Sequence, residues 1–308
     1  MEPEALEGFV IELGAAGEIG MAISLAMMMF AVALGLRAEH FAFFKTQPRH
    51  YLAGLTAQIL ALPLLTLALV HLLNPAPSLA LGMILVACCP GGNVSNLLAL
   101  FGRANTALSV SMTASSSLMA AFITPVSIVF WSSLYGPTRD LLGQIDFNIV
   151  SFLLQTLLIL GLPIALGMLV VRFAPKLAAR LQKPLALISG GALLLIIAGG
   201  VYTYHDLLLS AGALIIPLVI IHNGCALALG YGTGLLTRAD IATRRALTFE
   251  VGIQNSGLGL MILLTQMQGF GGAFAIIGAW GIWHIIAGTA MVAAFRLADK
   301  KTKRATHV

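Results

Sequence analysis

The chain has 308 residues, of which 59% are hydrophobic and only 9% are charged, with a formal net charge of +5 and a mean hydropathy of +0.96. Soluble domains carry about a quarter charged residues and about half apolar ones, so this composition excludes an ordinary soluble fold. It predicts a polytopic membrane protein, whose positive charge reflects membrane topology rather than nucleic-acid binding.

Long apolar runs predict nine membrane-spanning helices. A span needs about 20 mostly apolar residues, and Gly and Pro are tolerated inside it because neighbouring helices satisfy the freed backbone groups. In chain order the predicted spans cover residues 17–36, 50–72, 78–100, 106–132, 147–171, 184–204, 210–236, 243–266 and 272–297. The expected fold class is therefore all-α, in one transmembrane domain over residues 1–308.

The loops between these spans predict the orientation in the membrane. The N-terminal segment is acidic and lacks the basic region of a signal peptide. With that end outside the cell, all 17 Lys and Arg residues except Arg139 fall on the cytoplasmic side. Positive residues gather on that side in membrane proteins. We therefore expect a plasma (inner) membrane protein with its N-terminus outside and its C-terminus inside, and a basic surface connector over residues 172–184.

Two predicted spans carry polar, Gly-containing interruptions. Residues 90–96 read PGGNVSN and residues 251–257 read VGIQNSG, and the two spans run in opposite directions. Broken helices of opposite direction indicate an inverted-repeat transporter whose site lies where they meet. Gly and Ser also occur in many ordinary membrane helices, so the pattern alone leaves both interpretations open.

Glu250 is the acidic residue that falls inside a predicted span, whereas the other acids lie in termini, loops or helix ends. A charge at that depth is costly and is functional by default. No Lys or Arg stands within a span to pair with it, and Gln254, Asn255 and Ser256 follow closely. A single carboxylate among neutral oxygen donors suits Na+ better than Ca2+ or Mg2+. A proton is the competing coupling ion, and a protonated structural Glu is the remaining alternative.

Other polar side chains within the spans are ambiguous when taken singly. Ser109 and Thr113 share one helix face, which also fits ordinary interhelical packing, and Gln58 is a lone amide among apolar residues. His222 and His284 fit buried structural histidines as well as ligands. The three cysteines lie in apolar runs and indicate neither a disulfide framework nor a metal site.

Three segments together resemble the bile acid:sodium symporter family: ACCPGGNVSN at 87–96, NTALSVSMTASSS at 105–117 and FEVGIQNSGL at 249–258. The similarity extends from MMMFAVALGL in the first predicted helix to WHIIAG in the last. It implies an inverted repeat with two crossing broken helices. It also implies a core domain, over about 50–132 and 210–297, and a panel domain made of the helices near 17–36, 147–171 and 184–204.

The resemblance further implies two sodium sites and no other cofactor. Carried over position by position, the first sodium site consists of Ser95, Asn96, Ser109, Thr113 and Glu250. The second consists of the side chains of Gln58 and Gln254 with backbone oxygens of Glu250, Val251 and Ile253.

Substrate-binding residues are carried over in the same way. The implied set is Asn93, Asn255, Ser256 and His284. Asn93 stands where relatives commonly have Thr or Ser, and Ile285 stands where they have Asn. The sequence therefore determines the coupling ion better than it determines the substrate.

The expected function is sodium-coupled symport of an organic anion by alternating access, carried out by a monomer in the lipid bilayer. The anion is bile acid-like or a smaller organic acid such as pantoate. A proton-coupled or sodium-independent carrier of the same fold is the main alternative; arsenite extrusion and ligand sensing are others. An intramembrane enzyme is not expected, because no acid–base–nucleophile set is visible.

Overall fold

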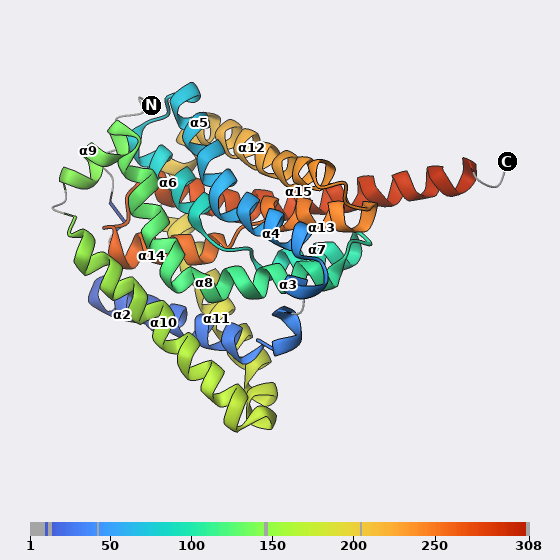
Figure 1. The fold of residues 1–308 in the computed structure, drawn as a ribbon. Coiled ribbons are helices and arrows are strands. Elements are labelled where there is room, and N and C mark those ends of the chain that lie inside the picture. The colour runs from blue at the N-terminus through green and yellow to red at the C-terminus, as the bar shows by residue number, and fades with distance from the viewer. Residues whose placement is uncertain (1–9, 12–13, 42, 145–146, 204, 306–308) are drawn as a thin grey trace.

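Helices dominate the computed structural model, which describes residues 10–11, 14–41, 43–144, 147–203 and 205–305 (Figure 1). Their bounds are α2 Gly14–Leu34, η1 Ala38–Phe41, α3 Phe43–Thr46, α4 Pro48–Thr56, η2 Ala57–Ala61, α5 Leu62–Leu73, α6 Pro77–Cys88, α7 Asn93–Phe101, α8 Thr106–Ser133, α9 Gly136–Gln144, α10 Ile149–Phe173, α11 Pro175–Thr203, α12 His205–Leu236, α13 Ile241–Gly252, α14 Ser256–Gln266 and α15 Gly271–Ala305. Within these residues the β-type contacts are two isolated bridges.

Five helical stretches of the described chain are long and apolar enough to cross a bilayer. They are Pro48–Leu73, Thr106–Ser133, Ile149–Phe173, Gly212–Leu236 and Gly271–Lys300. The predicted spans 17–36, 78–100 and 243–266 also contain helix, but their apolar stretches are shorter or interrupted, and the described residues of the span 184–204 lie within α11. The all-helical, multi-spanning class is confirmed, and the number of nine crossings stays a prediction.

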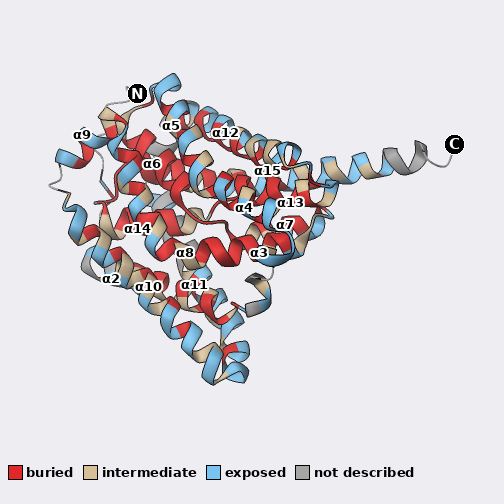
Figure 2. Ribbon diagram, in the orientation of Figure 1, coloured by how far each residue is buried: buried red, intermediate tan, exposed pale blue. Residues whose placement is uncertain are grey.

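Burial separates helices that face lipid from helices that face protein. On α10, Leu154, Leu158, Leu162 and Leu166 recur every fourth residue and are all exposed. Such a continuous apolar stripe on one helix face requires an apolar surrounding, which the bilayer supplies. In contrast, α6 is buried along its whole length after Pro77, and Figure 2 shows α6 and α14 as the buried centre.

The helices pack in groups that are not continuous in sequence. α2 packs against α10 and α11, α15 packs along α6, and α12 packs along α13. Contacts of α10 with α8 and of α2 with α14 join these groups. The predicted division into panel and core domains remains a prediction, since helix packing alone does not determine which group moves.

The basic segment 172–184, predicted as a surface connector, is mostly exposed in the structure. It includes the first turns of α11, which continues as one helix from Pro175 to Thr203. Pro175 occupies the first helical position, where its fixed φ angle favours helix initiation. The Ala, Leu, Lys and Gln residues that follow are strong helix formers, so the helix propagates without a break.

Both interrupted spans are broken helices, and they cross at their breaks. α6 and α7 are separated by residues 89–92, and α13 and α14 by residues 253–255. Gly91 and Gln254 form an antiparallel bridge, and the Asn255 backbone N donates to the Pro90 backbone O at 2.8 Å. Each extended segment therefore satisfies backbone groups of the other inside the protein, where water is not available to do so.

Candidate functional site

The carboxylate of Glu250 is the centre of a buried oxygen cluster near the crossing. Its side chain is 0% exposed. Ser95 Oγ and Ser109 Oγ each donate to Glu250 Oε1 at 2.5 Å, and Thr113 Oγ1 donates to Oε2 at 2.9 Å. Ser95 lies on α7, Ser109 and Thr113 lie one turn apart on α8, and Glu250 lies in the last turn of α13. Three helices thus bring their oxygens to one point.

Asn96 adds an acceptor oxygen that the hydroxyl protons of this cluster cannot fully satisfy. Its Oδ1 lies 2.9 Å from Ser109 Oγ and 3.3 Å from Thr113 Oγ1. Each hydroxyl carries a single proton, so it cannot donate to Asn96 and to Glu250 at once. The cluster therefore has more oxygen lone pairs than protons, which is the electrostatic setting of a cation site.

The charge of Glu250 has no basic partner within the described residues. Their ion pairs all involve other carboxylates, and the contacts of Glu250 are neutral hydroxyls. An isolated buried carboxylate is strongly disfavoured, so it requires either a bound cation or a proton. The predicted first sodium site is thus assembled as a set of neutral donors around one negative charge.

The predicted second sodium site gathers at the carboxyl end of α13. Gln58 Nε2 donates to the Glu250 backbone O at 2.7 Å, and Gln254 Nε2 donates to the Val251 backbone O at 2.8 Å. Both side chains are 1% exposed, and both Oε1 atoms lack a hydrogen-bond partner. The Ile253 backbone O accepts from the crossing backbone.

This end of α13 has the chemistry that a monovalent cation requires. The last carbonyls of a helix lack intrahelical partners and form the negative end of its dipole. Gln58 reaches them from η2, a π-helical turn within the α4–α5 helix, and such turns are frequent at functional sites. The unpartnered amide oxygens of Gln58 and Gln254 lie beside this negative helix end and are oxygen ligands of the kind that Na+ prefers.

A cavity of about 360 Å3 adjoins the oxygen cluster. Its walls come from the second half of α2, the first halves of α8 and α11, and the start of α7. Its polar lining residues are His40, Asn93, Asn96, Thr113, Ser117 and Gln182. Asn96 and Thr113 belong to the oxygen cluster as well, so a molecule in the cavity would touch the predicted first sodium site directly.

The titratable group in this cavity wall is His40. Burial and then the neighbouring Arg37 guanidinium lower the pKa of His40 below its usual value. The ring is therefore neutral at neutral pH, and the described lining carries no net charge.

The predicted substrate residues do not converge on this cavity. Asn93 lines it, but the Asn255 Oδ1 accepts from the Leu258 backbone N at 3.1 Å and so caps α14. Ser256 faces α15, where a Cβ atom at Gly281 would come within 2.9 Å of its Oγ. His284 is 4% exposed and lies outside the described cavity lining.

Two features escaped sequence reasoning. Asn223 Nδ2 donates to the Gly252 backbone O at 2.7 Å, directly at the break of α13. A lone Asn within the apolar run 210–236 is the same signal that singled out Gln58, so this residue could have been found. The contribution of His40 and Gln182 to the cavity has no such signal, because it depends on how α2 and α11 pack.

Known proteins match the chain over most of its length. The model of the sodium bile acid symporter family matches residues 22–210. A Bacillus subtilis protein named as an uncharacterized sodium-dependent transporter, YocS, is 32% identical over 283 residues, which span 92% of this chain and 84% of that protein.

Plant and animal proteins match as well. A probable sodium/metabolite cotransporter of Oryza sativa subsp. japonica, BASS2, is 31% identical over 242 residues, or 78% of this chain and 55% of that one. A sodium-dependent organic anion transporter of Bos taurus is 24% identical over 309 residues, which cover 98% of this chain and 78% of that one. Sodium-dependent transport is thus common to the names of all three relatives.

Proposed function

Because the chain belongs to the sodium bile acid symporter family, we propose that this sodium-coupled transporter carries a small organic anion together with two Na+ ions. The observation that carries the proposal is the shared wall of the cavity and the oxygen cluster, since Asn96 and Thr113 belong to both. An ion bound at Glu250 would fix these two side chains, and a substrate in the cavity would meet them already ordered.

The first Na+ is proposed to bind Ser95, Asn96, Ser109, Thr113 and Glu250, and the second to bind at the carboxyl end of α13. Support for the first is the excess of buried oxygen acceptors over protons. Support for the second is the pair of unpartnered amide oxygens on Gln58 and Gln254. A proton on Glu250 would neutralise the carboxylate but would leave these amide oxygens without a partner.

The substrate is proposed to be a small organic acid. α7 begins at Asn93 beside the cavity, and the free N–H groups of a helix start favour an anion. The cavity of about 360 Å3 lies near the lower end of the range for ligand sites, about 300–1,000 Å3. That size favours a pantoate-like acid over a steroid-sized anion, and the name of the bovine relative supports the anionic class.

Alternating access is the proposed mechanism. The cavity lies at the second half of α2 and the first half of α8, at the end predicted to face the cytoplasm. In this arrangement the transporter is open to the inside, with N-terminus outside and C-terminus inside. The core helices, with the crossing, would rock against the panel helices α2, α10 and α11 to expose the same site outside.

Thermal stability in matched Na+ and K+ solutions tests the ion sites. Binding to the folded state alone stabilises it, by about 2.7 kcal/mol at 100 times the Kd. We expect Na+ to raise the melting temperature of the wild type above that in K+. Glu250→Gln should abolish the part of this rise that is due to the first site, because it removes the charge and keeps the shape.

Ser111→Ala is the matched control for the loss of a hydroxyl. Ser111 lies on α8 between Ser109 and Thr113, is buried, and donates to its own helix at the Ala107 backbone O. The rise in melting temperature caused by Na+ should be the same in Ser111→Ala as in the wild type, whereas in Thr113→Val it should not. Equal melting of the wild type in both salts, with uptake in liposomes driven by a pH gradient alone, would replace this proposal by the proton-coupled carrier.

A further inference from the structure

Three amide side chains cap the broken end of α13. A helix that ends inside the protein leaves its last carbonyl oxygens without intrahelical partners. Here the backbone oxygens of three successive residues, Glu250, Val251 and Gly252, accept from side-chain amide nitrogens at 2.7, 2.8 and 2.7 Å. The donors are Gln58, Gln254 and Asn223, in that order.

All three amides share the same unusual state. Each is buried, Asn223 to 0% exposure, and each uses its nitrogen while its oxygen has no hydrogen-bond partner. Buried amide oxygens are nearly always satisfied in proteins, so three exceptions at one helix end need an explanation. Gln58 and Gln254 belong to the proposed second sodium site. Asn223 likewise donates its amide nitrogen to a backbone oxygen at the end of α13.

The helix that carries Asn223 is anchored through the preceding residue. The neighbouring His222 is fully buried, its Nε2 lies 2.7 Å from Thr66 Oγ1 on α5, and its ring packs on Trp280 of α15 with centroids 4.7 Å apart. One turn beyond Asn223, Leu227 approaches so closely that a Cβ atom at Gly252 would lie 2.3 Å from its Cδ2. α12 therefore presents the Asn223 amide to the break rigidly and at short range.

We propose that Asn223 is a positioning residue of the second sodium site. Its amide nitrogen holds the Gly252 carbonyl, and this fixes the peptide units on both sides, which carry the backbone oxygens of Val251 and Ile253 that would face the ion. Without that hydrogen bond the peptide units at the break can rotate, and the backbone oxygens of Val251 and Ile253 no longer point towards the ion. The inference rests on the proposed function, because it assigns a part in one of its two ion sites.

The test is a Na+ titration of thermal stabilisation with the purified full-length protein. We expect Asn223→Ala to raise the Na+ concentration for half-maximal stabilisation by about tenfold, the effect of losing one hydrogen bond that only the bound state needs in full. Thr138→Val is the matched control, because it removes buried hydrogen bonds from the Thr138 hydroxyl to the Ser132 and Tyr135 backbone oxygens, at α9 and away from the break. It should lower the melting temperature equally in K+ and Na+ and leave the Na+ midpoint unchanged.

A second comparison separates positioning from general packing. In a Gln58→Ala background, which lacks a ligand of the second site, Asn223→Ala should cause no further change in the Na+ midpoint. The reason is that the effects of substitutions within one site are not additive. An unchanged midpoint in Asn223→Ala, or a full tenfold shift in both backgrounds, overturns the inference while the wild type still responds to Na+. A wild type without any Na+ response defeats the proposed function itself. If Asn223→Ala does not fold, Asn223→Ser leaves a smaller cavity and is judged by the same criteria.

Discussion

Gly91 lies between the two proposed sodium sites. A Cβ atom on it would come 2.8 Å from Gln58 Nε2 and 3.0 Å from Glu250 Oε2. The adjacent Gly92 is different, because its nearest neighbour would be the Gln254 backbone O at an ordinary 3.5 Å. At the residue scale, Gly91 is thus the point where one methyl group would displace a side chain from each site.

We expect Gly91→Ala to weaken Na+ stabilisation strongly, by about tenfold or more in midpoint. The displaced atoms are the ends of flexible side chains, so the melting temperature in K+ should fall little. Gly92→Ala is the matched control and should retain the Na+ response. A Na+ titration of both variants checks this, and a normal midpoint in Gly91→Ala would show that the two side chains are not held where the ions bind.

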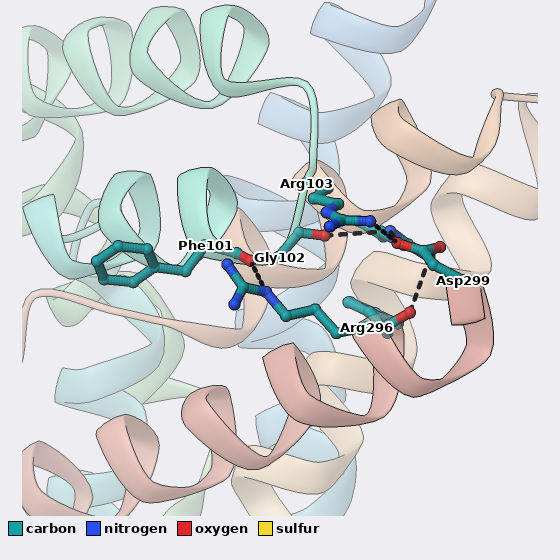
Figure 3. Close-up of polar contacts among 7 residues, drawn as sticks. Phe101, Gly102, Arg103, Arg296 and Asp299 are labelled. Atoms are coloured by element: carbon teal, nitrogen blue, oxygen red, sulfur yellow. Dashed lines mark hydrogen bonds and ion pairs between the residues drawn. The ribbon is translucent and has the colours of Figure 1, made fainter.

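At the scale of elements, an arginine–aspartate cluster ties three helix ends together (Figure 3). Arg245, in the second turn of α13, is paired with Asp299 of α15 through both guanidinium nitrogens, at 2.5 and 3.1 Å. It also donates to the Gly102 backbone O at 3.1 Å, and Arg296 Nε donates to the Phe101 backbone O at 2.7 Å. These carbonyls end α7, so the cluster joins α15 to the two half-helices that carry Ser95 and Glu250.

Breaking this pair should destabilise the protein. The Arg245 side chain is only 7% exposed and that of Asp299 22%, and removing one partner of a buried pair costs about 3 kcal/mol or more. We expect Asp299→Asn to lower the melting temperature in both Na+ and K+.

The exposed pair Arg139–Asp140, with its side chains 65% and 71% exposed, supplies the control. Arg139→Gln should change stability by no more than about 0.5 kcal/mol. Similar melting of Asp299→Asn and Arg139→Gln would mean that the cluster contributes no more than a surface ion pair does.

At the scale of the whole molecule, the two ends of α2 differ. Before its start, Val10 forms an antiparallel bridge with Phe270, and the Ile11 backbone N donates to the Gly269 backbone O at 2.9 Å. Towards its other end, the helix lines the cavity. The backbone is therefore joined across the helices at one end and separated by the cavity at the other, which supports the proposed inward-open arrangement.

A disulfide between Val10→Cys and Phe270→Cys should lock this state. Residues opposite one another in an antiparallel bridge bring their Cβ atoms within disulfide range. With the three native cysteines replaced by Ser or Ala, oxidation should stop uptake into liposomes and reduction should restore it. Full uptake by the cross-linked protein would mean that this contact need not open during transport.

Local chemistry was enough to predict the membrane class and to single out Glu250. The hydropathy of the apolar runs requires a bilayer. PGGNVSN and VGIQNSG allowed a break in each span, and the structure places the breaks at residues 89–92 and 253–255. Glu250 was readable because an unpaired acid within a span is rare. The oxygens of Ser95, Ser109 and Thr113 do meet it, as expected from the resemblance to the sodium symporter family.

The tertiary structure decided which residues from distant segments come into contact. The sequence did not indicate that Asn223 reaches the Gly252 carbonyl or that Arg245 pairs with Asp299. These contacts join positions 29 and 54 residues apart. Side-chain type and helical period are encoded locally, whereas a contact or a cavity wall is set by the packing of whole helices. The sequence therefore determined the membrane class and the buried acid, and the packing of α2, α8 and α11 determined the cavity.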